Sequence, residues 1–287
     1  EKGRIEPTVR DALESTFKHG NPWGRIRGKR TEWAEGLDVP VAAEGEAVPF
    51  LFYVGCTPAY DPRAQSIAKA LVALFDAAGV EYSTLGTDES CCGNEIRRMG
   101  EDGLFEMLVE GNREAFAGHE IGTIVTASPH CMNTFKNEYG ELPSDIVHYS
   151  QLLSSLLKEG KLTFKGSVEK TVTFHDACFL GKHNGIYDEP RDVLERIPGV
   201  TFEELDRSRE RALCCEGGGG RMWLEATEER GERLAETRVK DAVELGADYL
   251  VTACPFCLMT LEDAVKTSGN EGKIEIIDLA ELAAMAL

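Results

Sequence analysis

The sequence predicts an α/β protein built from two tandem repeated units, each a mostly parallel sheet with flanking helices. The first observation is a duplicated set of cysteines, whose equivalent members are 122 (178 − 56), 123 (214 − 91) and 126 (257 − 131) residues apart. The second is that strand-like apolar runs alternate with helical periodicity in both halves, which is typical of parallel sheets. We expect the two units to face each other about a pseudo-two-fold axis.

The expected boundaries divide the chain into a connector at residues 1–46, a first unit at 47–160 and a second unit at 161–287. In the connector, residues 6–17 have the pattern of a helix, 20–24 break it and 39–49 resemble a linker. The chain starts at Glu1 without a Met, which we interpret as a fragment or processed product that lacks upstream modules.

Each unit is expected to repeat one order of elements, because continuous apolar runs indicate buried parallel strands. In the first unit we expect strands at 50–54, 82–85 and 123–127, helices at 64–78 and 103–116, and a closing strand edge and helix at 146–153. In the second we expect strands at 171–174, 200–205 and 249–253, helices at 189–197 and 225–245, and a closing pair at 274–282.

Charge and hydropathy exclude several classes of function. The 31 basic and 50 acidic residues give a net charge of −19, which disfavours nucleic acid and anionic membrane surfaces as direct partners. No apolar run reaches the roughly 18 residues of a membrane helix, and we expect no signal peptide within this sequence. A small basic cluster at 25–30 is either a contact to neighbouring modules or lipid head groups, or part of a solvated linker.

All nine cysteines belong to the repeat, and we expect them to bind metal rather than form disulfides. An odd number, adjacent pairs and the missing secretory signal all argue against disulfides. Thiolates are soft ligands that select zinc or iron–sulfur clusters. The first group is Cys56, Cys91, Cys92 and Cys131, and the second is Cys178, Cys214, Cys215, Cys254 and Cys257.

The two groups are predicted to differ. Five thiolates in the second exceed the four that zinc or a cubane cluster needs, which favours a larger or open cluster. In the first, Ser128 stands where a fifth cysteine is expected, so four thiolates remain for a cubane, a modified cluster or zinc. Ser128 is a possible but poorer ligand of this site, because its hydroxyl is reluctant to ionise. The glycines at 217–220 would let backbone N–H groups approach inorganic sulfide, and they lack the spacing of a phosphate loop.

The Cys…Cys-Cys-Gly…Cys-x-x-Cys repeat resembles the cysteine-rich CCG domain family over about residues 49–287. That family includes catalytic subunits of heterodisulfide reductases, the iron–sulfur subunit of glycolate oxidase and membrane-associated electron-transfer-flavoprotein:menaquinone oxidoreductases. The segments 21–24 and 128–139 are most similar to the last of these branches. The resemblance implies an iron–sulfur oxidoreductase in a respiratory chain.

The resemblance also implies cofactors and partners. The five cysteines of the second unit would hold a non-cubane [4Fe–4S] cluster and the four of the first a [4Fe–4S]-type site, with zinc as the alternative there. Electrons would pass between a flavoprotein donor and a quinone chain, beside ferredoxin-like and membrane modules at the cytoplasmic face of the membrane. The alternatives are heterodisulfide-reductase-type catalysis at the second cluster and a zinc-stabilised scaffold without redox function.

We interpret the other notable residues mainly as structural or solvated, and we assign no catalytic residue. We expect His130 to be a satisfied loop histidine, and Lys182 and His183 to be solvated. The His175-Asp176 pair either supports the metal ligands from outside or packs at a strand end. Trp223 is expected to pack, and the charged stretch 228–240 to be a solvated helix face.

Overall fold

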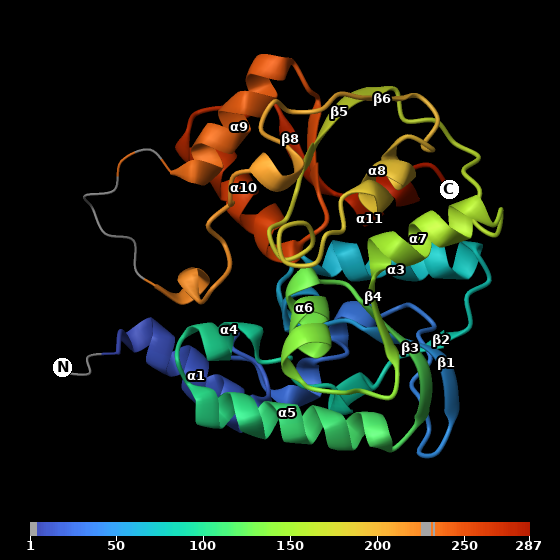
Figure 1. The fold of residues 1–287 in the computed structure, drawn as a ribbon, viewed down its shortest axis with the longest axis vertical. Helices are drawn as coiled ribbons and strands as arrows, with labels where there is room; N and C mark the ends of the chain where they lie inside the picture. The colour runs from blue at the N-terminus through green and yellow to red at the C-terminus, as the bar shows by residue number, and fades with distance from the viewer. Residues whose placement is uncertain (1–4, 225–230, 232) are drawn as a thin grey trace.

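The computed structural model describes residues 5–224, 231 and 233–287, and it contains two four-stranded parallel sheets (Figure 1). The strand orders are β2-β1-β3-β4 and β6-β5-β7-β8, so the second sheet repeats the first. The strands are β1 (Ala47–Tyr53), β2 (Tyr82–Ser83), β3 (Glu120–Thr126), β4 (Asp145–His148), β5 (Lys170–His175), β6 (Val200–Phe202), β7 (Tyr249–Thr252) and β8 (Glu275–Asp278). The predicted fold of two parallel-sheet units with flanking helices is confirmed.

Helices connect the strands and cover the sheets. They are α1 (Pro7–His19), α2 (Cys56–Tyr60), α3 (Gln65–Ala77), α4 (Asn94–Arg98), α5 (Asp102–Ala117), α6 (Pro129–Glu138), α7 (Tyr149–Lys158), α8 (Asp188–Leu194), α9 (Leu234–Leu245), α10 (Pro255–Thr267) and α11 (Leu279–Ala284). The reason for helix formation is clear in α3, where Ile67, Leu71 and Leu74 form one buried stripe. Among the described residues, no helix is both long enough and apolar enough to span a membrane.

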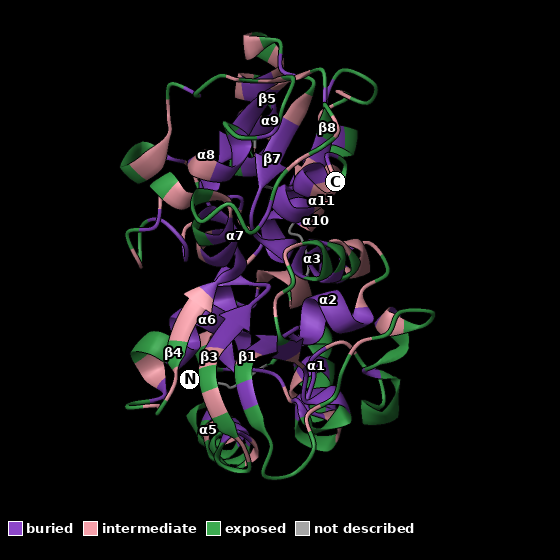
Figure 2. Cartoon of the chain, turned by 90° about the vertical axis from the view of Figure 1, so that its right-hand side faces the viewer, coloured by how far each residue is buried: buried purple, intermediate pink, exposed green. Residues whose placement is uncertain are grey.

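The carboxyl ends of the central strands are the most buried parts of both sheets. In β1 the exposed Ala47 is followed by the fully buried Leu51, Phe52 and Tyr53, and β3 shows the same gradient. The strand ends are buried because they point toward the other unit, and Figure 2 shows this as purple, buried residues in the middle of the molecule. The sites that follow these strands therefore lie near the junction of the two units.

The junction has a reciprocal pattern that fits a pseudo-two-fold arrangement. Helix α3 of the first unit packs on α11 of the second, and α7 of the first packs on α8 of the second. Since α3 and α8 each follow the first strand of their unit and α7 and α11 each close it, the two contacts are equivalent. Polar links join the units as well: Arg63 pairs with Glu262 and Glu281.

The structure corrects two expectations about charged segments. Helix α9 begins at Leu234 rather than 225, and residues 225–230 and 232 lie outside the described part of the chain. The solvated face expected at 228–240 is wrong for Arg238, which is fully buried and donates to the carbonyls of Arg207 and Phe174. These carbonyls compensate the lost hydration of the guanidinium.

In the basic cluster at 25–30, Arg25, Arg27 and Lys29 are exposed but Arg30 is not. Arg30 is buried against Glu89, and Arg27 donates to the Thr87 carbonyl and to Ser90 Oγ. Both interpretations of this cluster are therefore wrong for Arg30, because its partner carboxylate comes from the loop that precedes Cys91. The connector is tied to the first unit by these contacts.

Candidate metal centres

The first group of cysteines converges from three elements of the first unit. Cys56 begins α2 directly after β1, Cys91 and Cys92 lie in the loop before α4, and Cys131 lies in the first turn of α6. The sulfurs of Cys56 and Cys91 are 3.7 Å apart, and Cys92 interacts with both Cys91 and Cys131. All four cysteines line one small cavity together with Ser128 and His130. The structure thus brings together every residue predicted for this site.

The second group converges in the same way. Cys178 follows β5, Cys214 and Cys215 lie in the loop after residues 209–211, and Cys254 and Cys257 begin α10. The sulfurs of Cys215 and Cys257 are 3.3 Å apart. Cys178 and Cys214 shift each other's pKa, as do Cys214 and Cys215, and Cys254 and Cys257, so the five thiols adjoin one another as one group.

Crowding of the thiols affects their protonation. Hydrogen bonding with Cys91 and burial raise the pKa of Cys56, and hydrogen bonding with Cys131 has the same effect on the pKa of Cys92. In the second group, burial opposes ionisation of Cys254, but Cys257 and the His130 ring lower its pKa to about 5. Several thiolates cannot share so small a space unless cations offset their charge, which is the condition that metal binding meets.

Backbone N–H groups point at three of the sulfurs. Gly93 N donates to Cys91 Sγ at 3.4 Å, Glu216 N to Cys214 Sγ at 3.3 Å and Gly217 N to Cys215 Sγ at 3.4 Å. Gly93 and Glu216 occupy equivalent positions and both have positive φ, +84° and +65°. The left-handed conformation is costly for Glu216. It directs the backbone N–H groups of Glu216 and Gly217 at the two sulfurs, and such hydrogen bonds stabilise thiolates.

Glycine is required near both sites because neighbouring atoms leave no room for a Cβ. A Cβ on Gly55 would lie 3.3 Å from Cys131 Sγ, and one on Gly217 would lie 2.3 Å from Thr260 Oγ1. Together with nine free thiols and the N–H donors, this close backbone approach fits iron–sulfur ligation. The predicted role of the glycine run is therefore compatible with the geometry.

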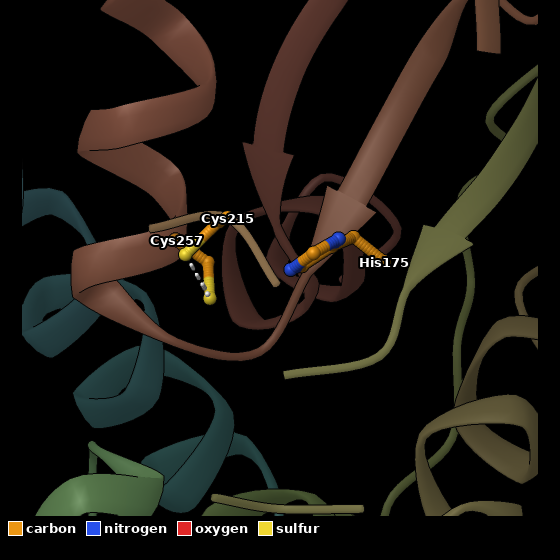
Figure 3. Close-up of side chains that lie close together, drawn as sticks. All are labelled: His175, Cys215 and Cys257. Atoms are coloured by element: carbon orange, nitrogen blue, oxygen red, sulfur yellow. Dashed lines mark hydrogen bonds between the residues drawn. The ribbon is translucent and has the colours of Figure 1, made fainter. Parts of the chain in front are cut away.

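His175 belongs to the second site. Its ring nitrogen lies within 4.8 Å of the Cys215 and Cys257 sulfurs, and Figure 3 shows the tip of the ring pointing toward them. Arg238 Nε donates to His175 Nδ1 at 3.4 Å, which leaves the proton on Nε2. Burial and the charge of Arg238 lower the pKa of His175 to about 3. A neutral ring with an Nε2–H suits a hydrogen bond to sulfur better than direct ligation, as the outer-support interpretation of His175 expects.

The remaining predicted residues follow their simpler interpretations. Asp176 pairs with the buried Arg191 rather than with a cysteine. His183 is exposed and stacks on Phe179, and Lys182 is exposed. Trp223 packs against Trp23 with ring centroids 5.6 Å apart.

His130 is satisfied, but it is not a loop residue. It lies in the first turn of α6, and its Nδ1 is 2.7 Å from Glu95 Oε1. Burial opposes its charged form, but Cys254 and Glu95 raise the pKa of His130 to about 10. The ring therefore reaches a cysteine of the other unit, which the sequence did not indicate.

Sequence reasoning also missed two buried carboxylates. Glu89 accepts from the backbone N–H groups of Val54 and Gly55, and so fixes the turn that leads to Cys56. Glu95 accepts from the backbone N–H of Gly220, which belongs to the glycine run of the second unit. Their position next to the Cys-Cys pair was a signal, but a glutamate is usually solvated.

The two sites differ in their access to solvent. All four cysteines of the first site are buried. In the second site Cys178 is partly exposed and Cys214 is exposed. The second site is therefore open on its Cys178–Cys214 side, and the first is enclosed.

Comparison with known families places the chain. The model for the cysteine-rich domain, CCG, matches residues 50–136 and again residues 172–262. This chain belongs to the CCG family. Both matches include complete cysteine groups of the two sites, apart from the different residue at Ser128.

Several proteins that are similar to this chain are named as oxidoreductases or reductases. The chain is 37% identical to a "Probable iron-sulfur-binding oxidoreductase FadF" of Bacillus subtilis, over 100% of the chain and 42% of that protein. It is 36% identical to an "EtfAB:quinone oxidoreductase" of Syntrophomonas wolfei, over 98% and 41%. It is 34% identical to one subunit of the dihydromethanophenazine:CoB–CoM heterodisulfide reductase of Methanosarcina acetivorans, over 94% and 66%.

The chain spans less than half the length of the first two relatives. The CCG matches and the names of these relatives agree with an iron–sulfur protein of the oxidoreductase class and support electron transfer in general. The prediction of an iron–sulfur protein is confirmed at this level.

Proposed function

We propose that this chain is the iron–sulfur module of a membrane-linked oxidoreductase that passes electrons between a flavoprotein donor and a quinone chain. The observation that carries the proposal is that the nine cysteines form two separate groups, both near the junction of the two units. The name of one relative, an EtfAB:quinone oxidoreductase, supports this donor and acceptor. Ferredoxin-like and membrane modules would complete the protein at the cytoplasmic face of the membrane.

The ligand sets follow from the two groups. Cys178, Cys214, Cys215, Cys254 and Cys257 would hold a non-cubane [4Fe–4S] cluster, and Cys56, Cys91, Cys92 and Cys131 a four-cysteine [4Fe–4S]-type cluster. Such clusters supply one-electron storage when bound. The protein supplies burial at the first site and N–H donors at both, and these set the environment of the sulfurs.

The different exposure of the sites suggests separate roles. The enclosed first site keeps water away from its sulfurs, which suits an internal relay. The Cys178–Cys214 edge of the second site is where a partner or a substrate can approach. Since the described chain has no long apolar helix, contact with the quinone pool would depend on other modules.

The test uses membranes that contain the complete protein. Reduced electron-transfer flavoprotein should reduce a menaquinone analogue, and Cys215→Ala should abolish this and lower the iron content, because Cys215 is buried in the second group. Lys18→Ala on the exposed face of α1 is the matched control and should change neither. Zinc in place of iron and sulfide, in a colourless protein, would instead establish the non-redox scaffold.

A second function is favoured by the exposure of Cys214. An open edge at the second site would let a disulfide substrate reach it, as in heterodisulfide-reductase-type catalysis. The relative that is named as part of a heterodisulfide reductase agrees with this alternative. It predicts that a thiol–disulfide substrate turns over while the flavoprotein is inert.

A further inference from the structure

The two Cys-x-x-Cys-type turns touch each other through their central residues. His130 lies in Ser128-Pro-His-Cys131, and Phe256 lies at the equivalent place in Cys254-Pro-Phe-Cys257. Their rings stack across the junction, with centroids 4.6 Å apart and planes inclined by 25°. Residues that the repeat makes equivalent thus meet at the contact between the two units.

Each of these residues enters the site of the other unit. Phe256 lines the cavity of the first site together with Cys56, Cys91, Cys92 and Cys131. In return, the ring of His130 stacks on Phe256, which lies between Cys254 and Cys257 in the turn of the second site, and it lowers the pKa of Cys254. The two sites are therefore not independent copies, because each is completed by a side chain from its neighbour.

The position of His130 is fixed from both units. From its own unit, Glu95 Oε1 lies 2.7 Å from His130 Nδ1, and the other Glu95 oxygen accepts from Gly220 N of the second unit. The ring of Phe179 packs against it at 4.6 Å. Gly218 leaves the space for the ring, since a Cβ there would lie 2.5 Å from His130 Cε1. The ring is therefore held between a carboxylate of its own unit and the cysteine turn and glycine run of the second unit.

We propose that His130 is a positioning residue that couples the two sites, because it belongs to the turn of the first site but packs on the Cys254–Cys257 turn of the second, where its polar ring raises the reduction potential of the second site. The proposal rests on the proposed function in that Cys254 must ligate a cluster. Hydrogen bonds to cluster sulfurs are one of the means by which proteins adjust potential. Coupling of this kind travels through directly packed groups, and here a single side chain joins the two sites.

The experiment is a redox titration of the cluster-loaded full-length protein, in which EPR follows each site separately. His130→Phe preserves an aromatic ring against Phe256 but removes both ring nitrogens, and with them any N–H donor to the second site. We expect the ratio of oxidised to reduced second site at a fixed potential to rise about tenfold, a shift of about 59 mV to lower potential for one electron. The first site should shift much less, and His130→Gln, which keeps one donor, should recover part of the change.

Two further variants keep the test decisive. His183→Phe is the matched control, since His183 is an exposed histidine stacked on the same Phe179, and it should leave both potentials unchanged. Gly218→Ala keeps His130 but displaces its ring, so it should shift the second site in the same direction. It also decides the case if His130→Phe fails to fold.

Specific results would overturn the inference. If the clusters load normally and the second-site potential is unchanged in both His130→Phe and Gly218→Ala, His130 does not act on Cys254. Equal shifts at both sites would show a general structural effect and would also reject it. A native protein without iron would refute the proposed function itself, and the inference with it.

Discussion

At the scale of the residue, Ser128 shows how one substitution separates two repeated sites. Its Oγ accepts a hydrogen bond from His130 N at 3.3 Å and caps α6, whereas Cys254 at the equivalent position makes no side-chain cap in α10. Ser128 also lines the first cavity with the four cysteines. A serine at this place therefore gives a helix cap instead of a fifth thiol.

Ser128→Cys should reverse that exchange. We expect a change in the iron content or EPR spectrum of the first site, because a fifth thiol would face the cavity. We also expect a loss of about 1 kcal/mol in the free energy of unfolding, since the cap is weakened. An unchanged iron content and spectrum would show that position 128 is not part of the site. Two identical five-cysteine-type clusters in the native protein would contradict the difference as well.

Individual residues also mark the limit of sequence reasoning. The sequence was enough to group all nine cysteines, because each group follows a predicted strand or lies in an adjoining loop. It could not show that His130 reaches Cys254 or that Arg238 is buried beside His175. Those contacts depend on how the two units pack and on which charges find partners, and neither is encoded in local spacing.

At the scale of the element, the connector is held to the first unit by a buried ion pair. Arg30 lies after the turn that ends α1, and Glu89 lies in the loop before Cys91; both side chains are 2% exposed. A backbone hydrogen bond of 2.7 Å from Cys91 N to Gly20 O joins the same two segments. The attraction of Glu89 and burial act in opposite directions on Arg30, and its pKa is raised.

Removing one partner of this pair should therefore be costly. We expect Glu89→Gln to lower the free energy of unfolding by about 3–5 kcal/mol, because Arg30 would keep a buried and uncompensated charge. Denaturant unfolding measures this loss, and Arg30→Met in the Glu89→Gln background should restore part of it. Glu14→Gln, in the exposed pair with Lys18, is the control and should cost less than about 0.5 kcal/mol. Similar losses in the two variants would contradict the buried pairing.

The elements themselves were largely predictable, with instructive exceptions. The strands and most helices lie where apolar runs and periodicity placed them, since those patterns follow directly from burial. Helices α6 and α10 occupy segments that the cysteine pattern indicated as loops, although Pro129 and Pro255 begin them. Proline at the first helical position was the signal in the sequence that a helix begins in each of these segments.

At the scale of the whole molecule, the two units are held together by equivalent helix contacts and by buried polar links. The repeat predicted that the units face each other, while the boundaries at 46 and 160 stay predictions. One link is a hydrogen bond of 2.6 Å from Tyr149 OH in the first unit to Asp278 Oδ1 in the second. Asp278 Oδ1 also accepts from Ala280 N and caps α11.

Asp278 should make the stability of the assembled pair of units depend on pH. Burial raises the pKa of Asp278 well above its usual 3.8. Above that value the unfolded chain loses this proton while the folded protein keeps it, so the free energy of unfolding falls as pH rises, until the folded carboxyl ionises too. The change can reach about 1.4 kcal/mol for each pH unit. Asp278→Asn should remove this contribution, because asparagine keeps the cap and the acceptor for Tyr149 without a titrating group.

The measurement compares denaturant unfolding of the native protein and Asp278→Asn between about pH 5 and about pH 8. The native protein should lose stability relative to the variant as pH increases. Asp248→Asn is the control: the Thr171 N–H lowers the pKa of Asp248 below its usual 3.8, so its contribution is constant across this pH range and the difference from the native protein should not change with pH. If the native protein gains stability relative to Asp278→Asn as pH rises, the carboxyl is ionised in the folded state, and the Tyr149–Asp278 link is a charged hydrogen bond rather than a neutral one.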